Sequence, residues 1–122
     1  MKAQDIRIGN LFTQKGFPMY VEAIFKDTVY LNFEGNEGDI WEEDIKDLVP
    51  IPLTEEILLK AGFEKDTGEF YIYKDITVRK TYYSDDFWRF IFKHQRIKDI
   101  KYLHDLQNTI SALTGEEIKI EL

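Results

Sequence analysis

The sequence predicts an α+β fold, in which a small curved antiparallel sheet is followed by a short helix, a β-meander and a C-terminal amphipathic helix. Three observations predict it. Residues 1–50 consist of short segments with β-type alternation, separated by turn residues. Residues 53–63 carry helix-capping signals, and residues 69–93 read as aromatic strands. Residues 97–113 then repeat apolar side chains at helical spacing.

The N-terminal strands are expected at residues 6–12, 17–25, 28–33 and from 40 onward. Alternation is cleanest from Phe17 to Phe25, where Phe17, Met19, Val21, Ala23 and Phe25 should share one face. Gly9-Asn10, Lys26-Asp27 and residues 35–38 supply bulges or turns. Short strands joined by tight turns are typical of a strongly bent sheet, so we expect an SH3-like barrel over residues 1–50.

A short helix is predicted from Glu55 to Ala61. Thr54 is a good N-cap, because its hydroxyl can accept a hydrogen bond from a free backbone N–H of the first turn. Gly62 suits the left-handed position just beyond the helix, and Phe63 can fold back onto the last turn.

Three antiparallel strands are expected next, at Glu69–Tyr73, Ile76–Tyr83 and Phe87–Lys93. Successive strand residues point to opposite faces, so Trp88, Phe90 and Phe92 share a purely aromatic face, which we assign to the core.

The last helix is predicted from Ile97 or Lys98 to Leu113, with a stop at Gly115. Its apolar residues should be buried against Trp88, Phe90 and Phe92; they are Ile100, Leu103, Leu106, Ile110 and Leu113. The tail over residues 118–122 alternates, and either adds a final strand or frays.

His104 lies in this helix and points roughly 140° away from the apolar arc. The same side carries Lys101, Asp105, Asn108 and Ser111. His104 and Asp105 are sequence neighbours, so their side chains diverge, and the helix offers no nucleophile or orienting partner. We therefore expect a solvated face; the alternative is a partner-binding face, or one arm of a site completed elsewhere.

Length and composition indicate one compact unit over residues 1–122, divided into a barrel-like region (1–50) and a helix–meander–helix region (51–122). The net charge is −7, of which residues 1–61 contribute −6, which argues against non-specific binding of nucleic acid or anionic lipid. The absence of Cys fits a reducing cytoplasm, and no apolar run has the length of a membrane span or signal peptide. We expect a soluble cytoplasmic protein.

No cofactor, metal or catalytic residue is predicted. The two histidines, His94 and His104, lack the close spacing of a zinc motif. Residues 32–43 offer calcium-type oxygen ligands, but Glu37 stands where an EF-hand needs glycine. Nucleotide-binding glycine motifs and the GxSxG pattern are absent.

Residues 79–101 are the sharpest local anomaly, with seven basic and three acidic residues in an acidic protein. Aromatic residues interleave with them, including Tyr82, Tyr83 and Phe87. A basic sheet face with stacking rings can hold single-stranded nucleic acid; a protein partner, or a solvated rim around an aromatic core, are the alternatives. The candidate contact residues are Arg79, Arg89, Lys93, Arg96, Lys98 and Lys101.

Three segments, DIRIGN (5–10), PIPLTEEILLKAGFE (50–64) and IKYLHDLQNTISALTGEE (100–117), together resemble a widespread family of small uncharacterised proteins. Members of that family are encoded in gut bacterial genomes and their phages or mobile elements. The resemblance spans nearly the whole chain. It implies a cytoplasmic protein with an accessory role, allows a prophage origin, and brings no catalytic residues with it.

These observations favour a non-enzymatic protein-interaction or accessory module with an unidentified protein partner. A nucleic-acid-binding module that uses the basic aromatic face around residues 79–101 is the alternative, and a small hydrolase-type enzyme ranks third. The sequence favours neither a monomer nor a homo-oligomer.

Overall fold

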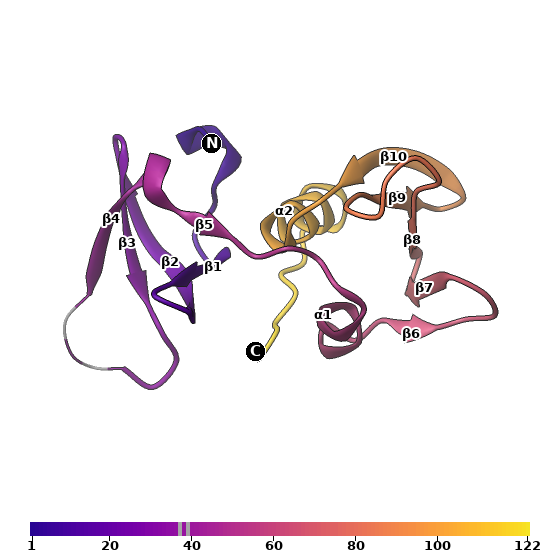
Figure 1. The fold of residues 1–122 in the computed structure, drawn as a ribbon, viewed down its shortest axis with the longest axis horizontal. Helices are drawn as coiled ribbons and strands as arrows, with labels where there is room; N and C mark the ends of the chain where they lie inside the picture. Colours follow the sequence, from indigo (N-terminus) through magenta and orange to yellow (C-terminus); the bar gives the residue numbers. More distant parts are fainter. Residues whose placement is uncertain (37, 39) are drawn as a thin grey trace.

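The computed structural model describes residues 1–36, 38 and 40–122. In this part of the chain, ten strands form two antiparallel sheets, and the two α-helices are α1 (Glu55–Lys60) and α2 (Leu103–Thr114). The sheets lie at opposite ends of the molecule, with α2 between them (Figure 1). The predicted α+β class is confirmed.

The first sheet is a curled half-barrel with the strand order β4-β3-β2-β1-β5. Its strands are β1 (Leu11–Gln14), β2 (Phe17–Phe25), β3 (Thr28–Asn32), β4 (Trp41–Asp44) and β5 (Val49–Pro50). Two short 3₁₀ turns flank it, η1 (Ala3–Asp5) and η2 (Ile45–Asp47). Its core is small and contains Ile6, Phe12, Met19, Val21, Val29, Leu31, Ile45 and Leu48.

Two predictions for this sheet were wrong in detail. The first strand begins at Leu11 and not at Ile6, because residues 7–10 form a turn in which Gly9 adopts a φ of 95°. The common face predicted for residues 17–25 also fails, because the register shifts between Val21 and Ala23. This bulge turns Phe25 outward and leaves Ile24 packed against the core.

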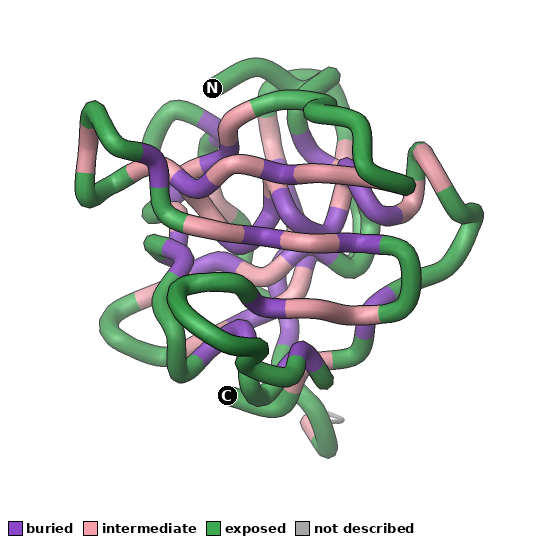
Figure 2. Tube along the Cα trace, turned by 90° about the vertical axis from the view of Figure 1, so that its right-hand side faces the viewer, coloured by how far each residue is buried: buried purple, intermediate pink, exposed green. Residues whose placement is uncertain are grey.

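The second sheet has the strand order β10-β9-β8-β7-β6. Its strands are β6 (Glu64–Lys65), β7 (Phe70–Tyr73), β8 (Ile76–Lys80), β9 (Trp88–Phe92) and β10 (Gln95–Ile100). Figure 2 views the molecule from the side of this sheet, and its nearest strands alternate buried and half-buried residues between exposed turns. The predicted meander is confirmed, but it is extended by two strands.

Strand β10 occupies residues that were predicted to begin the last helix, so that helix boundary was wrong. Lys93 and His94 adopt φ values of 49° and 68°, and these two left-handed residues form a tight turn that pairs Gln95 with Phe92. Such turns favour Asn and Gly, and Lys-His carries no such signal. Helix α2 therefore starts at Leu103, and it ends before Gly115, whose φ is 74°.

Helix α1 agrees with its predicted caps. The Thr54 hydroxyl accepts a hydrogen bond from the Ile57 N–H at 3.3 Å. Gly62 has a φ of 100°, and the Phe63 N–H donates to the Leu58 carbonyl at 3.0 Å, which closes the C-terminal turn.

Helix α2 packs its apolar side into the larger core, under the second sheet. Ile100, Leu103, Leu106 and Ile110 are buried with Trp88 and Phe90, which confirms the predicted packing for these residues. Leu113 and Phe92 pack against the same core but are only half-buried. The tail beyond Gly115 forms no strand. Instead, Ile118 is buried in the same core and Ile120 packs against it.

Candidate functional site

The polar side of α2 is not a solvated face, and that prediction was wrong for its central residue. His104 is only 4% exposed. Its ring lies 4.9 Å from the ring of Phe12 in β1 and stacks on Tyr102 at 5.8 Å, measured between ring centroids. The half-barrel covers this side of the helix, a tertiary contact that helical periodicity alone does not indicate.

Amide side chains join α2 to the chain that leads into β1. Gln107 Oε1 accepts a hydrogen bond from the Leu11 N–H at 2.9 Å, and Gln107 Nε2 donates to the Gly9 carbonyl at 3.2 Å. Asn10 Nδ2 donates to Asn108 Oδ1 at 2.8 Å. Gln107 thus satisfies two backbone groups as a neighbouring strand would. We call Gly9, Asn10, Leu11, Gln107 and Asn108 the polar joint.

The pKa and the hydrogen bonding of His104 follow from its burial. Burial lowers its pKa below the usual value, although the carboxylates of Asp105 and Asp5 act in the opposite direction. Its Nδ1 is buried with no hydrogen-bond partner, and its Nε2 lies 3.7 Å from Asp105 Oδ1. Asp105 already accepts the Tyr102 N–H at 3.1 Å as a helix cap. Among the described residues, no nucleophile is hydrogen-bonded to this imidazole.

The six predicted contact residues do not form a single patch. Arg79, Arg89 and Arg96 lie on the outer face of the second sheet, where Arg79 is the register partner of Arg89 and Arg96 that of Ile91. Lys98 and Lys101 line a separate groove of about 610 Å³ beside His104, between the N-terminal residues and α2.

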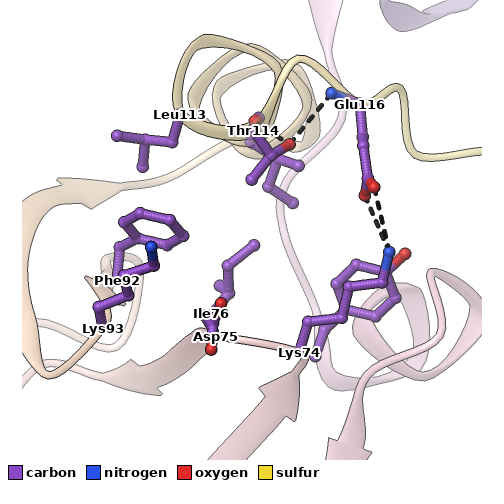
Figure 3. Close-up of a pocket in the computed structure, with 10 residues that line it drawn as sticks. Lys74, Asp75, Ile76, Phe92, Lys93, Leu113, Thr114 and Glu116 are labelled. Atoms are coloured by element: carbon purple, nitrogen blue, oxygen red, sulfur yellow. Dashed lines mark hydrogen bonds and ion pairs between the residues drawn. The ribbon is translucent and has the colours of Figure 1, made fainter.

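Lys93 stands apart from both groups. It lies in the turn between β9 and β10 and lines a pocket of about 280 Å³ under the end of α2 (Figure 3). Across that pocket, Lys74 Nζ is paired with Glu116 at 3.0 Å. Adjacency in the sequence therefore does not bring the basic residues together, because strand pairing and the turn send them to different surfaces.

We define the outer face as the residues of the second sheet that point away from α2, together with the loop after β8. Its members are Phe70, Ile72, Thr77, Arg79, Tyr82, Tyr83, Arg89, Ile91, Arg96 and Asp99. Two of its rings are strongly exposed, Tyr82 at 84% and Tyr83 at 64%. No other described segment covers this face, which is turned toward the viewer in Figure 2.

Asp99 pairs with two of the three arginines on the outer face and offsets one of their two positive charges. This carboxylate lies 3.5 Å from Arg89 Nε and 3.2 Å from Arg96 Nη2, and the Tyr83 hydroxyl donates to it. Burial by itself raises the pKa of Asp99. The hydrogen bond from Tyr83 and the two guanidinium groups lower this pKa by more than burial raises it, so it lies below its usual value. Two of the three arginines are therefore already paired.

Arg79 is the third arginine of the outer face, and it makes different contacts. Its guanidinium carbon lies 4.3 Å from the ring centroid of Tyr82 and 5.3 Å from that of Phe70. No ion pair among the described residues includes Arg79. Sequence reasoning noted Tyr82 but missed Phe70, which strand register alone brings next to Arg79.

A wider crevice of about 830 Å³ lies between the half-barrel and the tail, and its lining includes Tyr20, Phe33 and Ile120.

Within the described part of the chain, no group of three or more His, Cys, Asp or Glu is placed to hold a metal ion. The segment weighed for calcium contains Glu37 and Asp39, which lie outside the described residues. None of the described helices is long and apolar enough to cross a membrane.

Comparison with known proteins gives no assignment: no protein-family model, no curated protein and no solved structure matches the chain.

Proposed function

We propose that this protein is a non-enzymatic protein-interaction module whose contact surface is the outer face of the second sheet. The observation that carries the proposal is the group formed on this face by the half-buried Arg79 and the exposed rings of Tyr82 and Tyr83. These residue types are enriched in protein interfaces and at their energetic centres. The opposite side of the sheet is filled by the core, so this side is free for a partner.

Charge favours a protein over a nucleic acid as the partner. A nucleic-acid face needs unpaired cations along the path of successive phosphates. Here Asp99 binds Arg89 and Arg96, and the three lysines of the predicted set lie elsewhere. A protein interface tolerates such internal pairs, because its core is built mainly from rings and aliphatic side chains.

Single-stranded nucleic acid is the second candidate, and the rings of Tyr82 and Tyr83 are the observation that favours it, since bases stack on exposed aromatics. Binding of this kind would weaken steeply with salt and with the loss of Arg89.

We also propose a fold type for the half-barrel, and a location, role and origin for the protein. We propose that the half-barrel is SH3-like, which is supported by the pairing of β1 with both β2 and β5 and by the 3₁₀ turn η2 before the last strand. A cytoplasmic location rests on the absence of Cys. An accessory role and a phage or mobile-element origin rest on the resemblance of the three sequence segments.

Site-specific photo-crosslinking tests the contact surface. A benzophenone amino acid replaces either Tyr83 or Phe25, which are 64% and 62% exposed and lie on different sheets. Each variant is illuminated in two portions of host lysate, one treated with nuclease and one untreated. We expect a discrete crosslinked protein from position 83 and none from position 25. Equal crosslinking from both positions, or products that vanish on nuclease treatment, would contradict the proposal.

A further inference from the structure

We propose that Arg79 is the anchor of this surface, and that it binds a side-chain carboxylate of an acidic protein segment. The inference rests on the proposed function and names the chemistry of the partner. It starts from a difference between arginines on one sheet face: two are paired with Asp99, and the third is flanked by rings.

The guanidinium of Arg79 is positioned but not saturated. Its Nε donates to the Lys80 carbonyl at 3.4 Å, and none of the described residues accepts a hydrogen bond from its two terminal nitrogens. The rings of Phe70 and Tyr82 contact the guanidinium and limit its rotamers. A carboxylate can accept two parallel N–H bonds from such a fork, and Arg is preferred over Lys where this geometry is used.

The surrounding surface favours an isolated carboxylate over a run of phosphates. Asp99, Arg89 and Arg79 lie in register across three adjacent strands, so Asp99 is about 10 Å from the Arg79 position across the sheet. A phosphodiester chain that crossed this face would bring further negative charges toward Asp99. An acidic peptide can place one carboxylate at Arg79 and an apolar side chain against the rings of Tyr82 and Tyr83.

A displayed library of random peptides tests the inference without assuming a partner. The library is selected against the wild-type protein, and the most enriched peptide is labelled for fluorescence anisotropy. We expect enriched peptides to contain Asp or Glu beside an apolar residue. Arg79→Gln should weaken binding at least about tenfold, since hydrogen bonds between charged groups are lost. Arg79→Lys should weaken it similarly, because the charge remains but the fork is lost.

Arg96→Gln is the matched control on the same face. Its guanidinium is already paired with Asp99, so this substitution should change peptide affinity less than about threefold. Equal thermal unfolding midpoints of the three variants exclude a folding defect as the cause.

Several results would contradict the assignment of Arg79 as the anchor. Failure to enrich any peptide, enrichment of peptides without acidic residues, or equal binding by wild type and Arg79→Gln would overturn the anchor. A twelve-residue oligothymidylate that binds more tightly than the best peptide would overturn it in favour of nucleic acid. If position 83 still crosslinks a protein while Arg79→Gln changes nothing, the contact surface stands and only the anchor fails; if position 83 captures none, the contact surface itself fails.

Discussion

The polar side of α2 and the outer face of the second sheet both read from sequence as mixed polar surfaces, yet the structure treats them in opposite ways. On α2, His104 and Gln107 are each only 4% exposed, and the half-barrel covers them. On the outer face, Tyr82 and Tyr83 in the loop after β8 are exposed although they are aromatic. Burial therefore depends on whether a second element reaches a surface, and residue type alone does not determine it.

The two surfaces also handle their hydrogen bonds differently. In the polar joint, Gln107 satisfies the backbone groups of Gly9 and Leu11, so this amide can enter the interior without a large desolvation cost. The neighbouring His104 differs from it, because its Nδ1 is buried without a hydrogen-bond partner. On the outer face, Arg79 keeps donors that nothing in the described chain accepts. A satisfied polar surface suits a structural joint, and an unsatisfied one suits recognition of a partner.

The largest expected effect concerns the apolar side of α2. Leu106 is fully buried in the larger core, so Leu106→Ala should lower the free energy of unfolding by about 2–5 kcal/mol. Chemical denaturation measures the change. The matched control is Leu59→Ala in α1, because Leu59 is 48% exposed and should lose far less. Equal losses in the two variants would mean that α2 does not pack as described.

The polar joint should contribute less than the apolar core. Gln107→Ala leaves the Leu11 N–H and the Gly9 carbonyl without their partner, and should cost about 1–3 kcal/mol in the free energy of unfolding. Gln95→Ala serves as the control, since Gln95 is exposed in β10. If the two glutamine variants melt alike in urea, the joint is a solvated surface after all.

The buried imidazole predicts a pH dependence. Burial lowers the pKa of His104 below its usual 6.5, so the unfolded chain binds a proton just below pH 6.5 and the folded chain does not. The free energy of unfolding should fall as the pH drops below about 6.5 and should not depend on this group above it. Denaturation at a series of pH values should show this slope in wild type and in His94→Gln, but a reduced slope in His104→Gln. A slope that His104→Gln leaves intact would assign it to other groups.

Asp99 acts in a different pH range, which keeps the two groups separable. Its folded pKa lies below the usual 3.8, so its contribution is present above that value and is lost only at lower pH.

The smallest expected effect belongs to the exposed ion pair on the outer face. Arg96→Gln removes one partner of Asp99 but leaves Arg89 and Tyr83 in place. Because the Arg96 side chain is 60% exposed, the free energy of unfolding should change by about 0–1 kcal/mol, and this change should shrink as the salt concentration rises. A larger loss in a urea melt would show that the Asp99 cluster holds the sheet together and is not chiefly a surface feature.

The sequence predicted the elements whose signals are local. Thr54 and Gly62 define α1 by capping and by backbone conformation, and the apolar spacing of Leu103, Leu106 and Ile110 defines the buried side of α2. Strand β10 was not predicted from the sequence. The turn before it holds Lys93 and His94 in a left-handed conformation, and these residue types do not indicate such a turn.

The proposed contact surface was predicted only in part, for a physical reason. Arg79, Arg89 and Arg96 were all candidate contact residues, but the register of β8, β9 and β10 brings them to one face, and the role of each depends on its cross-strand neighbours. Asp99 pairs with Arg89 only because β10 exists, and Phe70 reaches Arg79 only through the register of β7 with β8. Likewise, His104 is interior only because the half-barrel packs on α2.

The most direct test of this contrast uses the only two histidines of the chain. His94 is exposed in the turn between β9 and β10, and His104 is buried beneath Phe12. The folded protein is treated with diethylpyrocarbonate, and the rate of modification at each position is followed by mass spectrometry. We predict rapid modification of His94 and protection of His104 until the protein is unfolded in urea. Modification of both histidines at similar rates in the folded protein would contradict the burial of the polar side of α2.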